Sequence, residues 1–504
     1  MSTPDYSPAR ALMRAARQRP HRDSIIWLPE GHKWSVSDSA EAVRRTASYL
    51  RALGIGEGDR VVLAAANTPW CYVLHCACSW LGAVTVPLSE RLPLPVFKEL
   101  LVSVKPRLLL LDEGLALPGT LLDEGLALPG TLLKDFTSEA LSAEPIEGEP
   151  PKRSDEIAAI VFTSGSAGRT RGVELTHSQL WWGSMCFRDG FEYCPGHEVL
   201  GVCAPISHIG GFNGTTIDVF THGGTLVVFP TFDPRQVLLA IEEHRITMMF
   251  LVPIMCHLLL DENAHVLADL SSWARPLIGG DLLSAALAAR MREAGLRPIH
   301  VWGMTETSGA GLMASPDSGA PTGALGAPFP YVDVRLVDED GAETPAGTVG
   351  EIEVRGPGVA SSFLNAGEEG PARIREGWLR TGDLATRDEA GWFMMLGRKS
   401  RMINTGGELV APTRIEELLL SLAEVEGACV VGVADARWGQ RVAALLVPRA
   451  GADARDALEI ARSLDELLAP WERVRQALWV EAIPLLPNGK PNAPEVQRIL
   501  EALG

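Results

Sequence analysis

The 504-residue sequence predicts an α/β fold, with a large N-terminal domain of stacked, mostly parallel sheets and a small α+β domain at the C-terminus. Three observations carry this prediction. Short apolar runs alternate with helical patterns in the first half. Strict polar–apolar alternation appears further on. A pattern of helix, two strands and helix fills the C-terminal part of the chain.

Alternation of apolar runs with helical patterns is typical of parallel sheets covered by helices. Val43, Ala47, Leu50 and Leu53 recur at helical spacing, and Gly54 follows as a helix breaker. The apolar runs expected as strands are Val61–Ala66, Ile157–Phe162, Leu226–Phe229, Met248–Val252 and Pro276–Ile278, and a helix is expected over Ser284–Ala294.

Two later segments, Tyr331–Val337 and Glu351–Val354, alternate strictly, as half-exposed antiparallel strands do. The C-terminal α+β pattern consists of helices over Pro412–Leu422 and Ala454–Leu468 and strands over Ala428–Val433 and Val442–Val447.

Composition excludes several classes of function. A net charge of −18 argues against a nucleic-acid partner, since phosphate binding generally needs a basic face. No apolar run is long enough for a membrane span, and the first twenty residues lack a secretory pattern. The eight cysteines lie mostly in apolar runs, and Cys76 and Cys78 have no second pair that would complete a zinc site. Buried free thiols and a reducing cytoplasm are therefore expected.

An exact tandem repeat, LDEGLALPGTL, occupies Leu111–Leu121 and Leu122–Leu132. Two copies of 11 residues do not make a solenoid, which needs at least three longer units. We interpret the repeat as a duplication tolerated in a surface loop, where added length costs little entropy.

The segment Thr163–Gly172 (TSGSAGRTRG) combines three glycines, four hydroxyls and two arginines directly after an apolar run. Glycines let backbone N–H groups approach an anion, hydroxyls add donors and guanidinium groups add charge. Its spacing fits neither a Walker A loop nor a dinucleotide-binding Gly-x-Gly-x-x-Gly motif. The residues thus predict a phosphate loop of another kind.

This loop and six further segments resemble the adenylate-forming superfamily of acyl-CoA synthetases, luciferases and peptide-synthetase adenylation domains. The superfamily loop has the form Thr-Ser-Gly-Ser/Thr-Thr-Gly-x-Pro-Lys-Gly, and the other motifs follow in the same order along nearly the whole chain. They are Pro205–Gly211, Trp302–Glu306, Gly350–Pro357, Trp378–Asp383, Gly397–Glu408 and Pro487–Lys490. Each is weak alone, and their shared order argues against chance.

The resemblance implies an AMP-forming acyl-CoA ligase that uses ATP, Mg²⁺ and coenzyme A. Residues 1–400 are expected to bind the acyl-adenylate and to include a small β-barrel-like part. Residues 401–504 are expected to form a mobile lid domain that carries the catalytic lysine. The implied partners are CoA and a small carboxylic acid or its adenylate, and the protein is expected to be a cytoplasmic monomer or homodimer.

In the first step of that reaction a carboxylate attacks the α-phosphorus of ATP, so positive charge has to bring two anions together. By resemblance, Lys490 bridges the carboxylate and phosphate oxygens, while Asp383 and Arg398 bind the ribose. Glu306 is expected to hold Mg²⁺, which prefers carboxylate and phosphate oxygens, and Thr305 to donate to the α-phosphate. The remaining nucleotide-contacting residues implied are Thr163, Ser164, Gly165, Ser166, Gly168, Arg171, Gly280, Asp281, Trp302 (under adenine), Gly303 and Met304.

In the second step a thiol attacks the acyl-adenylate. The resemblance makes Arg401, where Asp or Lys is usual, the hinge about which the C-terminal domain turns. That motion presents Gly406, Gly407 and Glu408 to the pantetheine arm of CoA. The residues implied at the acyl site are His208, Gly210, Gly211, Phe212, Asn213, Gly279 and Gly309, with His208 near the reacting ends. Gly210, Gly211, Gly214, Gly309 and Gly311 further suggest an open pocket for a bulky, hydrophobic acyl group.

Two departures weaken the phosphate loop. Ala167 stands where the family has Thr, and Arg171 stands where it has Lys. Losing one donor at developing charge costs about 2.7–4 kcal/mol by analogy with oxyanion holes. We therefore hypothesise slow adenylation, or adenylation by another enzyme, as in ligases of platensimycin and platencin assembly.

Two other classes of function remain open. An adenylation enzyme that loads a separate carrier protein is one, although Asn213 and Gly214 follow Phe212 where amino-acid-activating members carry Asp. A non-enzymatic member is the other, and it is disfavoured because Lys490 and Asp383 are both present.

Overall fold

The computed structural model describes residues 4–113, 115, 130–164, 170–365, 373–449, 456–485 and 491–503. By internal contacts the chain divides into a first unit, residues 1–334 with 354–380, and a second unit, residues 335–353 with 381–504. The boundary expected at residue 400 concerns a hinge motion, which this division does not test, so it stays a prediction.

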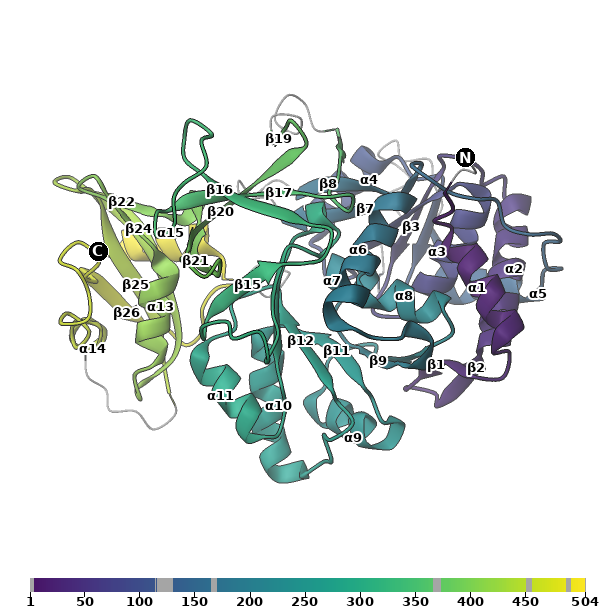
Figure 1. Cartoon of the computed structure of the whole chain (residues 1–504), viewed down its shortest axis with the longest axis horizontal. Coiled ribbons are helices and arrows are strands. Elements are labelled where there is room, and N and C mark those ends of the chain that lie inside the picture. The colour runs from purple at the N-terminus through teal and green to yellow at the C-terminus, as the bar shows by residue number, and fades with distance from the viewer. Residues whose placement is uncertain are drawn as a thin grey trace. The chain divides into compact units, whose positions relative to one another are not determined.

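One sheet of the first unit contains the parallel run β13-β12-β11-β9-β10-β1, bordered by antiparallel strands at both ends (Figure 1). Its strands are β1 (Asp23–Trp27), β2 (His32–Ser35), β9 (Val199–Val202), β10 (Thr225–Val228), β11 (Met248–Leu251), β12 (Arg275–Gly279), β13 (Ile299–Trp302), β14 (Leu312–Ala314) and β15 (Ala324–Pro328). The apolar runs of the sequence thus became parallel strands, as predicted.

The second sheet of this unit has the order β18-β8-β7-β4-β3-β5-β6, in which β7 to β6 pair in parallel and β8 and β18 are antiparallel. Its strands are β3 (Arg60–Ala64), β4 (Val84–Leu88), β5 (Leu108–Leu111), β6 (Gly130–Leu132), β7 (Ile157–Ser164), β8 (Thr170–Thr176) and β18 (Ser362–Leu364). The largest core cluster includes side chains of both sheets and of the helices around them.

The helices of the first unit are α1 (Pro8–Gln18), α2 (Val36–Ala52), α3 (Trp70–Leu81), α4 (Leu94–Val104), α5 (Leu133–Ser142), α6 (His177–Phe191), α7 (Ile209–Phe212), α8 (Thr215–Thr221), α9 (Pro234–His244), α10 (Pro253–Val266) and α11 (Ala285–Glu293). Ser35 and Asp38 cap the start of α2 reciprocally, and Val43, Ala47 and Leu50 are buried, as predicted. The helix ends before Leu53, which is exposed, so that part of the prediction was wrong. Helices α1, α2 and α3 pack together (Figure 1).

The second unit contains two strand paths, of which the second is antiparallel. One is β16-β17-β20-β21 and the other is β23-β22-β25-β24, with β26 beside β25. The bounds are β16 (Asp333–Val337), β17 (Gly350–Arg355), β20 (Trp378–Arg387), β21 (Phe393–Arg398), β22 (Ile403–Thr405), β23 (Glu408–Val410), β24 (Val425–Asp435), β25 (Gly439–Pro448), β26 (Gln476–Trp479), α13 (Pro412–Leu420), α14 (Ala457–Arg462) and α15 (Ala493–Leu503). The short strand β19 (Ile374–Arg375) belongs to the first unit. The strand order of the first path does not test the expected small β-barrel-like part, which stays a prediction.

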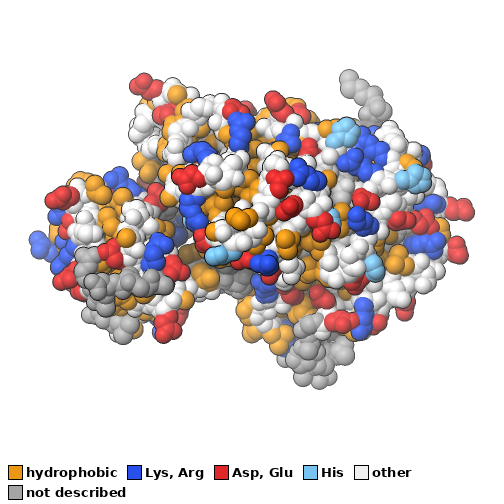
Figure 2. All heavy atoms as spheres, turned by 90° about the horizontal axis from the view of Figure 1, so that it is seen from below, with side chains coloured by type: hydrophobic (Ala, Val, Ile, Leu, Met, Phe, Trp, Pro, Cys, Tyr) orange, Lys and Arg blue, Asp and Glu red, His pale blue; other side chains and the backbone are white. Residues whose placement is uncertain are grey.

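The C-terminal α+β prediction is confirmed except for the helix expected over Ala454–Leu468. Helix α14 ends at Arg462, because the chain then turns at Ser463 before Pro470. Acidic and basic side chains are interspersed over the face drawn in Figure 2. Within the described parts of the chain, no helix is long and apolar enough to cross a membrane.

All eight cysteines are free, and seven are buried, as predicted; Cys194 is exposed. The tandem repeat lies between β5 and β6, with its first residue, Leu111, in β5 and its last three residues in β6. Residue 114 and residues 116–129 are outside the described residues, so the surface-loop interpretation stays a prediction.

Candidate active site

Strands β7 and β8 form an antiparallel pair that holds both ends of the predicted phosphate loop. Their register pairs Thr163 with Arg171, and the Thr163 hydroxyl donates to the Arg171 carbonyl at 3.4 Å. The loop is therefore shorter than the sequence suggested, because Arg171 and Gly172 are strand residues. Gly172 lets the chain pack on Leu364, whose Cβ would lie 3.0 Å from an added Cβ. Gly165, Ser166 and Gly168 and the side chain of Ser164 lie outside the described residues.

The segment after β13 buries the predicted metal ligand. A 3₁₀ turn, η3 (Thr305–Thr307), places Glu306 with only 2% of its surface exposed. Arg373 Nη1 lies 2.8 Å from Glu306 Oε1 and donates a hydrogen bond to it. Glu306 Oε2 is buried without a hydrogen-bond partner in the described part of the protein. A buried carboxylate with one oxygen unsatisfied is costly, so this site favours a cation or a donor at Oε2.

The chemistry of Glu306 fits Mg²⁺. Among the described residues no group of three or more His, Cys, Asp or Glu side chains could enclose a metal. A Mg²⁺ ion held by a single carboxylate completes its shell with water and substrate phosphates, which is its usual mode in phosphoryl-transfer sites. Sequence reasoning missed Arg373, because a pairing across 67 positions leaves no periodic signal.

The Trp302-Gly303-Met304 segment is folded tightly against its own continuation. Trp302 is 9% exposed, and a Cβ on Gly311 would lie 2.5 Å from its ring. A Cβ on Gly303 would collide with the Gly309 carbonyl. Thr305 is likewise buried. This packing fixes the backbone that leads into Glu306, while the stacking role of Trp302 stays a prediction.

The Gly279–Asp281 segment ends strand β12. Gly280 adopts a positive φ of 79°, and the exposed Asp281 accepts from the Leu282 N–H at 2.9 Å. A Cβ on Gly279 would lie 2.6 Å from the Val301 carbonyl oxygen. Glycine at 279 thus brings β12 and β13 close together, and Gly280 provides the turn away from the sheet.

The predicted acyl segment forms α7, with His208 as the residue before its first turn. Neighbouring residues occupy the space beside the glycines that were expected to leave an open pocket. A Cβ on Gly210 would lie 2.7 Å from the Phe250 ring, one on Gly309 would lie 3.3 Å from Phe187, and one on Gly211 would meet the Pro205 carbonyl. Two phenylalanines distant in sequence thus lie beside Gly210 and Gly309, and the open pocket stays a prediction.

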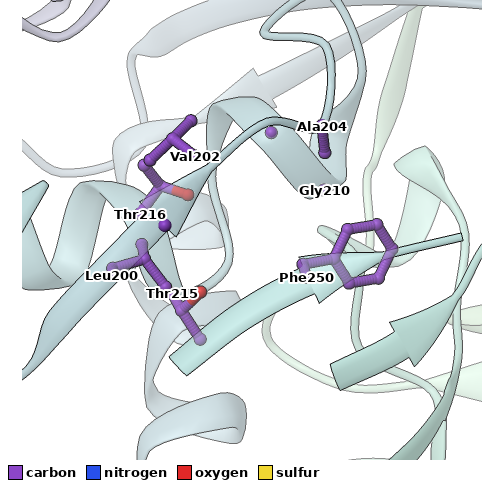
Figure 3. Close-up of a pocket in the computed structure, with 9 residues that line it drawn as sticks. Leu200, Val202, Ala204, Gly210, Thr215, Thr216 and Phe250 are labelled. Atoms are coloured by element: carbon purple, nitrogen blue, oxygen red, sulfur yellow. The ribbon is translucent and has the colours of Figure 1, made fainter. Parts of the chain in front are cut away.

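A small cavity remains beside Phe250 (Figure 3). Its volume is about 10 Å³, and Gly210, Thr215, Thr216 and Phe250 are among the residues around it. That volume is near the minimum for one water molecule. This cavity cannot take an acyl group unless the half-buried Phe250 side chain moves.

Phe212 and Asn213, at the end of α7, are fully buried. The Phe212 ring meets the His75 ring edge-on, with centroids 5.0 Å apart. Asn213 Nδ2 donates to the Leu180 carbonyl at 3.2 Å, which ties the acyl segment to α6. Both residues are thus held in place by helices that the sequence motif does not include.

In the second unit, the two residues expected at the ribose are brought together. Asp383 and Arg398 face each other across β20 and β21, and Arg398 Nε lies 2.6 Å from Asp383 Oδ1. Asp383 is 2% exposed, whereas the Arg398 side chain is 42% exposed. This arrangement leaves Arg398 accessible while its charge compensates the buried carboxylate.

The predicted hinge and thiol-side loop also lie in the second unit. Arg401 Nη2 is 2.9 Å from Glu416 Oε1 on α13. Gly406 and Gly407 turn between β22 and β23 with φ of 65° and 91°. The Trp438 ring packs on Gly406, and the Trp438 carbonyl accepts from the Gly406 N–H at 2.8 Å. Trp438 was missed, since a lone aromatic residue gives no positional signal.

Lys490 lies outside the described residues, so its predicted role is untested by the structure. The exposed Glu408 begins β23 directly after the two glycines. The roles given to Arg401, Gly406, Gly407 and Glu408 therefore rest on the motif and remain predictions.

Comparison with known proteins identifies the family. Residues 12–364 match the model of the AMP-binding enzymes, and residues 414–490 match that of the AMP-binding enzyme C-terminal domain. The chain is 31% identical to a feruloyl-CoA synthase from an Amycolatopsis species over 96% of this chain and 97% of that protein. It is 29% identical to indoleacetate–CoA ligase from Aromatoleum aromaticum over 95% of each chain.

The fold also matches solved structures over nearly the whole chain. The o-succinylbenzoate-CoA synthetase of Bacillus subtilis, in complex with its acyl-adenylate intermediate, superposes with a TM-score of 0.88 over 99% of both chains at 26% identity. MatB from Rhodopseudomonas palustris, with ATP bound, superposes with a TM-score of 0.89 over 99% of this chain and 100% of that one at 25% identity. The chain therefore belongs to the AMP-binding enzyme family and is an AMP-forming acid–CoA ligase.

Proposed function

We propose that this ligase activates a ring-containing carboxylic acid with ATP and transfers the acyl group to coenzyme A. The similar proteins named above act on feruloyl and indoleacetate groups. A further relative, 30% identical over 97% of this chain, is a Mycobacterium tuberculosis ligase of a dioxo-octahydroindenyl propanoyl group. Ring-bearing acids are common to all three.

The observation that carries the ATP-dependent part of the proposal is Glu306. Its buried Oε2 is unsatisfied within the described residues, while Arg373 compensates Oε1. We assign Mg²⁺ to that oxygen, where it would supply positive charge to the ATP phosphates. Thr305, adjacent to Glu306, is assigned to the α-phosphate. Asp383 and Arg398 are assigned to the ribose hydroxyls.

The proposed reaction has two half-reactions. A carboxylate oxygen of the acid bonds to the α-phosphorus, the bond from that phosphorus to the bridging oxygen breaks, and pyrophosphate leaves. The CoA thiol then bonds to the acyl carbon, the acyl–phosphate bond breaks, and AMP and the thiol proton leave. Lys490 is assigned to the first step and Arg401 with Gly406–Glu408 to the second.

The experiment is an acid panel incubated with ATP, Mg²⁺ and CoA, with pyrophosphate and the CoA thioester measured separately. Glu306→Gln is expected to lower pyrophosphate release by about 10²-fold, and Lys490→Ala is expected to abolish it. Lys490→Ala should still form the thioester from a synthetic acyl-adenylate. Equal loss in both half-reactions would contradict the role assigned to Lys490, and no turnover with any acid or adenylate would contradict the function.

A second candidate is an enzyme that mainly performs the thiol-transfer step on a preformed adenylate. The observation favouring it is the position of Arg171, whose guanidinium carbon lies 6.0 Å from the centroid of the Phe363 ring. Arginine presents its charge as a planar fork and lysine as a compact point charge on a flexible stem, so Arg171 changes the geometry of the charge offered to a phosphate. Ala167 removes a further donor. Ordinary ATP-dependent turnover on any acid would exclude this candidate.

We also propose that the enzyme works in the cytoplasm as a monomer or homodimer. Its eight free cysteines support a reducing compartment, where structural disulfides are rare.

A further inference from the structure

Strand β17 contributes a second buried acid, Glu351, beside the turn that leads into Asp383. Glu351 is 7% exposed, and its Oε1 accepts from the Gly382 N–H at 3.2 Å. Gly382 has a φ of 78°, in the left-handed region that favours glycine. The Glu351 carboxylate therefore fixes a turn that has an uncommon backbone conformation and directly precedes Asp383.

The N–H of the next residue, Asp383, is held from the same strand. The Thr381 hydroxyl accepts from that N–H at 3.1 Å and donates to the Ile352 carbonyl at 2.8 Å. Thr381 is 1% exposed, so water has little access to compete for these hydrogen bonds. Neighbouring residues of β17 thus hold two consecutive N–H groups of the turn, one through the Glu351 carboxylate and one through Thr381.

Two basic side chains offset the two buried acids. Arg398 Nε lies 2.6 Å from Asp383 Oδ1, and Lys399 Nζ lies 3.7 Å from Glu351 Oε2. The acidic side chains are 3% and 9% exposed, whereas the basic ones are 42% and 47% exposed. A hydrogen bond to a charged acceptor is about twice as strong as one between neutral groups. A carboxylate at position 351 therefore holds the Gly382 N–H more firmly than a neutral amide would.

Glu353, two positions further along β17, is a buried acid with a different task. Alternate residues of a strand share a face, so Glu351 and Glu353 lie on the same side of β17. Glu353 is 4% exposed and pairs with Arg335 of β16, whose Nη2 lies 2.8 Å from Glu353 Oε2. That pair joins two neighbouring strands, whereas Glu351 holds the turn before the predicted ribose ligand.

We propose that Glu351 is a positioning residue for the nucleotide: by holding the Gly382–Asp383 backbone, it aims the Asp383 carboxylate at the ribose hydroxyls. This inference rests on the proposed function, which assigns Asp383 to the ribose, and adds a residue that acts through Asp383. ATP, the acyl-adenylate and AMP share the same ribose. Glu351 therefore serves both half-reactions, and its effect is measurable in nucleotide binding without turnover.

The test measures the Kd of the full chain for AMP and for 2′,3′-dideoxy-AMP by isothermal titration calorimetry. We expect the natural enzyme to bind AMP at least about tenfold more tightly, since a site built to hydrogen-bond hydroxyls discriminates against their absence. Glu351→Ala should weaken AMP binding by about tenfold and change the Kd of the dideoxy nucleotide by about twofold or less. The preference for the ribose hydroxyls should shrink accordingly.

Equal weakening of both nucleotides in Glu351→Ala is the result expected of a merely structural acid, and it would overturn the inference. An unchanged preference for AMP would do the same, as would a natural enzyme that binds the two nucleotides equally. Formation of a CoA thioester from any acid of the panel would in each case leave the ligase function standing, so the two failures are distinguishable.

Glu351→Gln keeps an oxygen for the Gly382 N–H without the charge. Its preference for AMP should fall between those of the natural enzyme and Glu351→Ala, and it gives the same readout if the alanine variant does not fold. Glu353→Ala is the matched control, because it removes the other buried acid of the strand. It should lower the midpoint of thermal unfolding and leave the preference unchanged. A Glu353→Ala protein that loses the preference as Glu351→Ala does would contradict the inference.

Discussion

The ion pair between Glu306 and Arg373 allows a quantitative prediction about the first unit. Replacing Arg373 by Met removes the guanidinium that donates to Glu306 Oε1 at 2.8 Å. The Glu306 side chain is 3% exposed and the Arg373 side chain 22% exposed, so water cannot easily replace the lost partner. Both carboxylate oxygens would then be buried without their present compensation.

The magnitude follows from that burial. Removing one partner of a fully buried ion pair costs about 3–5 kcal/mol, and the partial exposure of Arg373 places this case near 3 kcal/mol. Glu306→Gln should cost only about 1 kcal/mol, since an amide oxygen still accepts from Arg373 and the guanidinium left without a carboxylate is partly exposed to water. The double variant should lose far less than the sum of the two, because no buried carboxylate remains to be stranded.

The assay is urea unfolding of the four proteins, followed by tryptophan fluorescence and compared at equal slope. The coupling free energy from the double-mutant cycle should be about 2–3 kcal/mol. Additive effects of the two substitutions, within about 0.5 kcal/mol, would refute the claim that Arg373 compensates Glu306. An Arg373→Met protein as stable as the natural one would refute the assigned burial cost.

Three further predictions concern other parts of the molecule. Phe250→Ala should admit larger acids, seen as a rise in their kcat/KM relative to small acids. It should lower the free energy of unfolding by about 2 kcal/mol, half the loss for a fully buried phenylalanine. An unchanged size preference would contradict the claim that Phe250 fills this space. Deleting Leu122–Leu132 shortens the β5–β6 connection from 18 residues (112–129) to 7. The free energy of unfolding should change by only about 0.8 kcal/mol, and turnover should be unaltered. A chain that no longer folds would disprove the claim that the duplication is merely tolerated. Because burial lowers the pKa of His75 to about 4, the unfolded state binds more protons than the folded state between pH 6.5 and 4. The free energy of unfolding should therefore decrease as the pH is lowered from 6.5 to 4, by about 3 kcal/mol from His75 alone. His75→Leu should remove that part of the slope, and an identical slope in the variant would count against it.

Local patterns predicted the elements of the fold well. Helix α2, strands β7, β10, β11 and β12 and helix α11 formed where periodicity and caps indicated them, since these signals act over a few neighbouring residues. Motif residues also came to lie near one another or at element ends, as with Asp383 opposite Arg398 and Glu306 after β13. The helix predicted over Ala454–Leu468 was too long, because the apolar spacing continues past Ser463, where the chain turns.

Long-range packing could not be predicted in the same way. The sequence shows that Gly210 and Gly309 lack side chains, but not that Phe250 and Phe187 fill the space. The pairing of Arg373 with Glu306 likewise depends on segments that only the folded chain brings together. No periodicity within one element reports on such contacts.

The tandem repeat gives strand β6 two interchangeable sequences. The strand itself is Gly130-Thr131-Leu132, and the same three residues occur at Gly119–Leu121. Either triplet could pair with β5 in the same way. If the first copy formed β6, the 11 residues that now precede the strand would instead follow it. The strand pairing would be the same whichever copy formed β6. We therefore expect a peptide inserted on either side of β6 to leave the sheet intact.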